Sequence, residues 1–210
     1  MMAVRRLLIL PGLVLALVAC SGDDGAEKTA AAKRPQGCPA AFKPEWQRLA
    51  NRVGVPVYCP NWMPSPLDAD IGGQWNSAGP VVGRDRSYLV GFLWHEASSG
   101  DVHVNFRGYP GRTRIPRCVD VQTSGRETRR RLVPCFSDPR GTRRVAGVQA
   151  TVYTVSRDAD QWHVTYLWRR DGTLYTVSEH VAPPLTFRRV LTNLDRIVGG
   201  LALIRPKRDG

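Results

Sequence analysis

Residues 161–182, QWHVTYLWRR-DG-TLYTVSEHVA, decide the fold of this chain. Two runs rich in aromatic and β-branched residues flank an Asp-Gly dipeptide, which is typical of a two-residue type I′ turn. Such a turn fixes the register, so Trp168 should face Tyr175 across the two strands. The sequence therefore predicts a β-hairpin with one polar face and one apolar face, the latter interrupted by Glu179.

The segments around this hairpin predict a mixed domain. Apolar residues recur at helical spacing over 186–198, and a Gly-Gly pair ends that pattern, so we expect a helix lying on the apolar face of the hairpin. A shorter helix is expected over 44–53. The sequence predicts strands over 55–58, 87–96, 102–107, 148–156 and 201–204. Because both faces of 87–96 are apolar, we place that strand centrally in the sheet. The expected fold class is α+β: an antiparallel sheet with an N-terminal and a C-terminal helix packed on one face.

The amino terminus has the features of an export signal. Arg5 and Arg6 precede an apolar run that ends in Leu17-Val18-Ala19-Cys20. A basic start, an apolar middle and small residues before a cleavage point are typical of a secretory leader. The run is shorter than the about 20 residues of a bilayer-spanning helix. We expect export by general secretion, and twin-arginine export is the alternative route. For Cys20, the alternative to lipid modification is an ordinary cleaved leader that happens to end in a cysteine.

Residues 1–37 resemble bacterial lipoproteins, whose four-residue lipobox ends in a cysteine. Leu17 to Cys20 match each position of that box. The resemblance implies a signal peptide over 1–19, diacylglycerol on Cys20, and attachment to the extracytoplasmic face of the cell membrane. Residues 145–205 are similar to small exported actinobacterial proteins of unknown function. Some envelope lipoproteins of this appearance have curved half-barrel sheets and carry lipids, which implies a curved sheet here.

The residues after the leader divide into a tether and one domain. Residues 20–37 contain no large apolar side chain, so they cannot bury enough surface to offset chain entropy. We interpret them as an acylated cysteine followed by a flexible tether, with an end-to-end distance of roughly 20 to 25 Å. Residues 38–210 are long enough for a single globular domain.

Four cysteines are left once Cys20 is acylated: Cys38, Cys59, Cys118 and Cys135. An even number in an oxidising compartment predicts two disulfides, for which three pairings exist. We favour the two local pairs, Cys38 with Cys59 and Cys118 with Cys135. A zinc site would need closely spaced Cys or His pairs, which the sequence lacks.

The chain is strongly basic, with a formal net charge of +12 that falls to +10 once Arg5 and Arg6 leave with the leader. Eleven arginines face three acidic residues between Phe106 and Val145, a segment that we interpret as a solvated loop. Codon bias in a GC-rich genome is one reading of this excess. The other is contact with an anionic lipid or wall polymer. The residues predicted to make it are Arg126, Arg129, Arg130, Arg131, Arg143 and Arg144.

The sequence contains few groups of residues that could form a catalytic or metal-binding site. His163 faces His180 in the predicted hairpin, yet the sequence shows no third ligand that would complete a metal site, so we interpret this as an exposed polar pair. His95, Glu96 and His103 lie near another turn, where the register is open. The motifs G-x-S-x-G, S-x-x-K and H-E-x-x-H do not occur. Asp68 to Gly73 lacks the ligand spacing of a calcium loop.

We therefore expect a membrane-anchored envelope lipoprotein with a non-enzymatic binding or interaction role, for a lipid or for anionic envelope material. No cofactor, metal or nucleic acid partner is expected, and the oligomeric state is left open. The alternatives are a hydrolase that acts on cell-wall or lipid material, which would need a cleft joining a hydroxyl or carboxylate to a histidine, and a structural partner of another envelope protein.

Overall fold

The computed structural model describes residues 37–65, 67, 81–96, 100–158 and 162–207. The predicted leader, Cys20 and nearly all of the tether lie outside the described residues, as does the Asp68 to Gly73 segment. Within the described residues, no helix combines the length and the apolar character needed to cross a bilayer.

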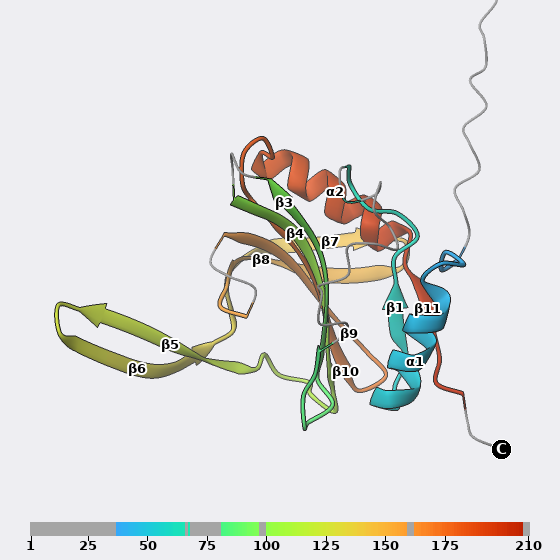
Figure 1. The fold of residues 1–210 in the computed structure, drawn as a ribbon, viewed down its shortest axis with the longest axis horizontal. Coiled ribbons are helices and arrows are strands. Elements are labelled where there is room, and N and C mark those ends of the chain that lie inside the picture. Colours follow the sequence, from blue (N-terminus) through green and yellow to red (C-terminus); the bar gives the residue numbers. More distant parts are fainter. Residues whose placement is uncertain (1–36, 66, 68–80, 97–99, 159–161, 208–210) are drawn as a thin grey trace, which may run out of the picture. The chain divides into compact units, whose positions relative to one another are not determined.

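A seven-stranded sheet forms the centre of the domain (Figure 1). All of its neighbouring strands pair antiparallel. Its strands, in spatial order, are β2 (Val81–Val82), β3 (Tyr88–Glu96), β4 (Gly100–Pro110), β10 (Thr173–His180), β9 (His163–Arg170), β8 (Val148–Ser156) and β7 (Phe136–Val145).

Strands β9 and β10 form the predicted hairpin in the predicted register. Arg170 pairs with Thr173 and Trp168 with Tyr175, whose rings stack with centroids 5.9 Å apart. Both residues of the turn have positive φ, 49° at Asp171 and 73° at Gly172. This is the backbone that a type I′ turn requires, and it explains how two residues set the register of the sheet centre.

The domain contains two helices, whose ends lie within one residue of the ranges expected from the sequence. Helix α1 (Lys43–Val53) carries Pro44 in its first turn and ends at Gly54, whose φ is 69°. Helix α2 (Phe187–Gly199) is capped by Thr186, whose hydroxyl accepts a hydrogen bond from the Arg189 backbone N–H at 3.2 Å. Such a cap satisfies a helix N–H group that would otherwise lack a partner.

A small two-stranded sheet joins the two ends of the domain. Strand β1 (Val57–Cys59) pairs antiparallel with β11 (Ala202–Ile204). Tyr58 of β1 packs edge-on against Trp168 and Tyr175 of the central hairpin, with centroids 5.3 and 4.9 Å away. The sheet is thereby tied to the same aromatic core as β9 and β10.

Two disulfides confirm the favoured local pairing. Cys38 bonds Cys59, and Cys118 bonds Cys135, over 21 and 17 residues of sequence. Closing loops of this size stabilises a fold by about 3 kcal/mol each in the loop-entropy picture. The coarse fold prediction is thus correct: a mostly antiparallel sheet with two helices and two disulfides.

Two expectations about strand placement are wrong. Strand β3 is not central: only the two-residue β2 lies outside it, and Leu89 and Leu93 are half-buried. The segment from Phe106 to Val145 is not loop, since most of it forms the end of β4, strands β5 and β6, and β7. Its strands lack a continuous buried face, so the alternation that marks a strand in sequence is missing.

Candidate functional site

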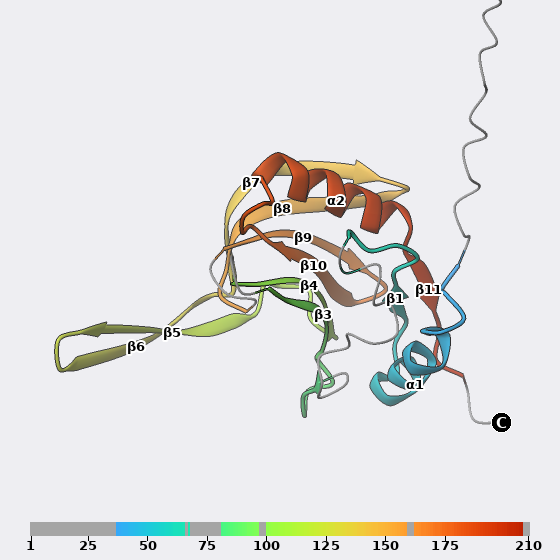
Figure 2. The same cartoon turned by 45° about the horizontal axis from the view of Figure 1, so that its top comes forward.

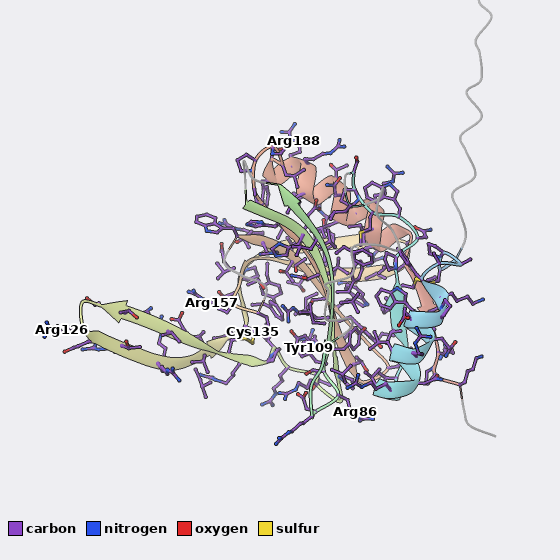
Figure 3. The ribbon with its side chains drawn as sticks, in the orientation of Figure 1. Arg86, Tyr109, Arg126, Cys135, Arg157 and Arg188 are labelled. Carbon is purple, nitrogen blue, oxygen red and sulfur yellow. A yellow bond between two sulfur atoms is a disulfide. The ribbon has the colours of Figure 1, made fainter. Side chains whose placement is uncertain are left out.

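Within the segment predicted as loop, residues 117–134 form a β-hairpin that we call the arm. Strand β5 (Arg117–Ser124) pairs along its whole length with β6 (Glu127–Pro134) in a sheet of its own. Two views show the arm extending away from the seven-stranded sheet (Figures 1 and 2). Nearly all of its residues are exposed. Gly125, with a φ of 59°, and Arg126 form the turn at its tip, where Arg126 is labelled in Figure 3.

One face of the arm is apolar and exposed. The register places Val119 opposite Leu132, and Val121 opposite Arg130, on the same face. The three apolar side chains are 56%, 58% and 53% exposed in the order Val119, Leu132, Val121. These three neighbouring side chains form an exposed apolar strip, a kind of surface that occurs at interaction sites.

The opposite face of the arm is polar and holds the arm to the domain. The buried Asp120 carboxylate accepts from the Arg131 guanidinium at 3.1 Å, and pairs with Arg157 at 3.3 Å. Cys118 and Cys135 are cross-linked at the base, near which Figure 3 labels Cys135 and Arg157. The base of the arm is therefore fixed by a covalent bond and by an ion pair from outside the arm.

The structure separates the six predicted contact arginines into two groups. Arg126, Arg129, Arg130 and Arg131 lie on the arm, whereas Arg143 and Arg144 lie on β7 of the main sheet. Arg143 pairs with Asp195 of α2 at 3.1 Å. On the arm, Arg129 pairs with Glu127 and Arg131 with Asp120, while no ion pair with a described residue is recorded for Arg126 or Arg130.

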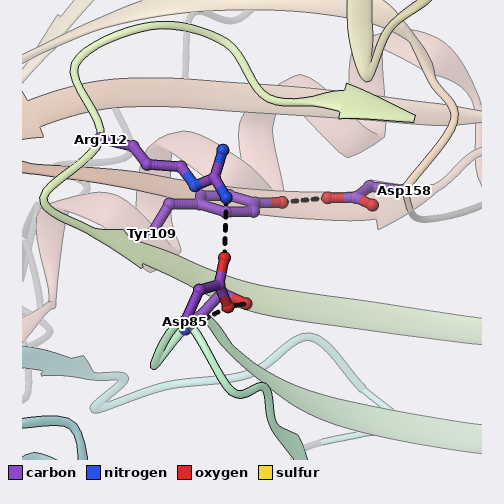
Figure 4. Close-up of polar contacts among 5 residues, drawn as sticks. Asp85, Tyr109, Arg112 and Asp158 are labelled. Atoms are coloured by element: carbon purple, nitrogen blue, oxygen red, sulfur yellow. Dashed lines mark hydrogen bonds and ion pairs between the residues drawn. The ribbon is translucent and has the colours of Figure 1, made fainter. Parts of the chain in front are cut away.

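A basic hollow of about 480 Å³ lies at the base of the arm. It is lined by Arg112, Thr113, Arg114, Ile115, Pro116, Arg117 and Leu132, so its wall is continuous with the apolar face of the arm through Leu132. Arg112 also pairs with Asp85 at 2.9 Å (Figure 4). Hydrogen bonds from Ser87, and the contact with Arg112, lower the pKa of Asp85 to about 2, so this carboxylate is ionised at neutral pH.

A second, mostly apolar groove of about 510 Å³ opens where β8 and β9 separate. These strands pair only from Thr151–Leu167 to Tyr153–Thr165, although each continues further. Trp162 and Phe187 border the groove and are 69% and 45% exposed. The lining consists of Arg140, Thr154, Trp162, His163, Val164, Val181 and Phe187. Among the described residues, the large apolar side chains that are exposed all lie either on the arm or at this groove.

Asp158, two residues after the end of β8, is held by side chains of β4. Its carboxylate accepts a hydrogen bond from the Tyr109 hydroxyl (Figure 4), and its carbonyl oxygen accepts one from Arg107. Burial raises the pKa of Tyr109 far above its ordinary value, so the phenol keeps its proton and stays a donor. Local patterns in the sequence do not reveal this network, because its members come from β4 and from a turn about 50 residues later.

Three histidines converge on the sheet face opposite Glu179. His180 pairs with His163, and the β4–β10 register places His103 next in the same row. Nε2 of His163 lies 2.7 Å from Nε2 of His103. His163 is 1% exposed, so the expectation of an exposed pair is wrong. That face is covered at the hairpin, where Thr165, Thr176 and Ser178 are also buried. The sequence could not show that His103 joins the pair, because local patterns do not give the order of strands.

Among the described residues, the ligand atoms of one group of side chains all lie within 4.8 Å of one another: Cys118, Cys135 and Asp158. An Asp158 carboxylate oxygen lies 3.1 Å from the Cys118 sulfur. Both sulfurs belong to the disulfide and are not thiolates, so this cluster lacks the donors that a metal needs.

Comparison of the chain with protein-family models, with curated protein sequences and with solved structures finds no significant match.

Proposed function

We propose that this protein is a lipid-anchored envelope protein that binds anionic membrane lipid through its arm. The observation that carries the proposal is the combination, on one exposed face, of Val119, Val121 and Leu132 with Arg130. Apolar side chains can enter the interfacial layer of a bilayer, while arginines pair with anionic headgroups. The basic hollow at the base of the arm adds Arg114 and Arg117 for the same headgroups, while its third arginine, Arg112, is paired with Asp85.

The lengths of the arm and the proposed tether are compatible with this role. Each arm strand has eight residues, which span roughly 26 Å at a strand rise of about 3.3 Å per residue. The tether after Cys20 has an expected span of roughly 20 to 25 Å. An arm of this reach can touch the headgroups of the membrane to which the tether is attached.

The anchor is tested by replacing Cys20 with serine in the native host. We expect the parent protein to fractionate with membranes and to carry a lipid on an N-terminal Cys20 by mass spectrometry. The C20S variant is expected in the soluble exported fraction, because the hydroxyl cannot receive the thioether-linked diacylglycerol. A parent protein with an unmodified or absent Cys20 would refute the anchor.

The arm is tested separately, with the full chain carrying C20S and vesicles of phosphatidylglycerol in phosphatidylcholine. Replacing Arg126 and Arg130 with glutamine should weaken binding roughly 30-fold, since each arginine at an anionic surface contributes about 1 kcal/mol. Binding should also weaken with salt, as the Debye length falls to about 3 Å at 1 M. The measurement is vesicle co-sedimentation across a salt series.

R143Q/R144Q is the matched control, because it removes the same charge from β7 of the main sheet instead of the arm. This control should bind within about threefold of the parent after allowance for the general loss of charge. Equal losses in the two double variants would overturn the role of the arm. V119S/L132S should also weaken binding, since it removes apolar surface without charge. If it has no effect while a soluble anionic polymer competes fully, the ligand is a wall polymer and not a bilayer.

A hydrolase is the second candidate, because the groove brings the Thr154 hydroxyl and the His163 imidazole into one lining. The Thr154 hydroxyl, however, donates to Asp138 Oδ2 at 2.5 Å on the β7 side. A nucleophile needs a base within hydrogen-bond reach, and the recorded contacts of Thr154 supply no histidine. The binding role is therefore the better supported of the two.

The finer fold expectation is part of this proposal: the main sheet is curved, and both helices cover the same face of it. Its support is that Trp46 of α1 and Leu194 of α2 belong to one buried cluster with Phe106 and Tyr166 of the sheet. This arrangement leaves the face with the histidine row on the other side of the sheet.

A further inference from the structure

The loop that joins β4 to β5 forms most of the basic hollow, and several contacts hold it to the domain. Arg169 of β9 donates from Nε to the Thr113 carbonyl oxygen at 2.6 Å. The Cys135 N–H donates to the Pro116 carbonyl oxygen at 2.9 Å. Ile115 packs against buried side chains from β4, β7, β9 and β10. The shape of the hollow is therefore set before a ligand arrives, which lowers the ordering cost of binding.

The charges in the hollow are not balanced. Among the described residues, its lining contains three arginines and no carboxylate. Asp85 lies outside the lining and offsets one of these charges by pairing with Arg112 at 2.9 Å (Figure 4). No ion pair with a described residue is recorded for Arg114 or Arg117. The hollow thus keeps an excess of positive charge that attracts an anion.

The donor groups of the lining suit a phosphate group. Arg117 donates from its guanidinium to the Leu132 carbonyl oxygen at 2.5 Å, a bond that orients the guanidinium and still leaves donors for a ligand. Arg114 adds a second guanidinium, and Thr113 adds a hydroxyl. A guanidinium binds two oxygens of one phosphate through parallel hydrogen bonds. A tetrahedral phosphate offers more oxygens to such a donor set than a planar carboxylate does.

The rim of the hollow indicates what the phosphate is attached to. Leu132 belongs both to the lining and to the apolar face of the arm, where it lies opposite Val119. A molecule that carries a phosphate beside an apolar chain can therefore contact both surfaces at once. The volume of about 480 Å³ lies within the roughly 300 to 1,000 Å³ that is typical of small-ligand sites.

We propose that this hollow binds the phosphodiester group of a glycerophospholipid, with Thr113, Arg114 and Arg117 as donors and Leu132 beside the start of the acyl chains. The inference deepens the proposed function and rests on it for the source of the lipid, since it assigns one headgroup to a defined site. The phosphate contact itself needs neither a bilayer nor the tip of the arm, so the two proposals can fail separately.

The test is a nuclear magnetic resonance titration of the isotope-labelled full chain with Cys20 replaced by serine. The probe is dihexanoyl-phosphatidylglycerol below its micelle concentration. It should shift the amide signals of Thr113, Arg114 and Ile115 with saturation at one lipid per chain. R114Q should weaken binding roughly tenfold or more, because a hydrogen bond to a charged group contributes at least about this factor. The R114Q fold should be unchanged, since no contact of the Arg114 side chain with a described residue is recorded.

R126Q is the matched control, because it removes one arginine charge from the tip of the arm and leaves the hollow intact. It should bind the probe within about threefold of the parent. No saturable shift at the loop, or equal affinity in R114Q and the parent, would overturn the site. A failed vesicle experiment with R126Q/R130Q would instead remove the role of the arm and leave this titration standing.

Glycerophosphoglycerol, the same headgroup without acyl chains, separates a lipid from other phosphodiesters. It should bind more weakly than the lipid, because it buries no apolar surface on Leu132. L132S should reduce this difference while it keeps the backbone carbonyl that Arg117 contacts. Equal affinity of the parent for the two probes would overturn the lipid assignment and indicate a wall polymer.

Discussion

Replacing Glu179 with glutamine should make the protein more stable at alkaline pH, by several kcal/mol. Glu179 lies in the core with no exposed surface, and only one of its carboxyl oxygens has a recorded hydrogen-bond partner among the described residues. That partner is Asn193 of α2, whose amide donates to Oε1 at 2.7 Å. Burial raises the pKa of Glu179 from its ordinary 4.5 to about 8, although the Asn193 hydrogen bond opposes the rise.

The direction of the pH effect follows from this raised pKa. Between pH 4.5 and pH 8 the folded protein holds a proton that the unfolded chain has lost. The contribution of Glu179 to stability is thus fully present below pH 4.5, and it is lost as the pH rises through about 8. The loss over this interval is roughly 4 to 5 kcal/mol at about 1.4 kcal/mol per pKa unit. Glutamine carries no such proton, so E179Q lacks this loss.

Urea unfolding of the parent and of E179Q between pH 5 and pH 9 measures the difference. The two proteins differ at one side chain, so the difference between their curves reports on Glu179. The matched control is E127Q, which makes the same chemical change on the exposed arm and should follow the pH dependence of the parent. Parallel curves for the parent and E179Q would show that Glu179 is ionised in the fold across this range.

Replacing Gly108 with alanine should destabilise the protein by about 2 to 4 kcal/mol. Gly108 of β4 lies between Tyr88 of β3 and Tyr175 of β10 in the register. A Cβ atom at this position would fall 2.2 Å from Cε1 of the Tyr88 ring. Tyr88 is itself in the core, so the ring cannot move aside without displacing its neighbours.

Thermal unfolding of G108A, and of G199A as control, checks this steric explanation. Gly199 ends α2, and its nearest atom to an added Cβ lies 3.4 Å away, so alanine should be nearly neutral there. Tyr88→Leu in the G108A background should recover part of the loss, because the two sites would then couple. Additive effects of the two substitutions would contradict a clash between Gly108 and Tyr88.

Local chemistry made the hairpin, both helices and the disulfides predictable. The Asp-Gly turn allows one register only, and the cap at Thr186 together with the Gly-Gly end defines α2 within one residue. These features depend on neighbours in the chain, which a sequence displays directly.

The features that could not be predicted depend on residues far apart in the sequence, or belong to strands that bury no continuous face. Strands β5 and β6 escaped prediction because their apolar residues face solvent and their arginines interrupt the alternation. Strand β7 contains a register shift between Pro139 and Thr142, which breaks the two-residue period. The histidine row requires β4 to lie beside β10, and only the assembled sheet provides that order.

The cross-link between Cys118 and Cys135 has a consequence for how this protein can change over generations. The disulfide joins the two ends of the arm where it leaves the domain. Insertions, deletions or substitutions between Cys118 and Cys135 therefore change a loop whose ends are already held together. The length and surface chemistry of the projecting hairpin can then drift almost independently of the aromatic interior. We therefore expect the arm to tolerate changes of length and surface chemistry without a matching change in the scaffold.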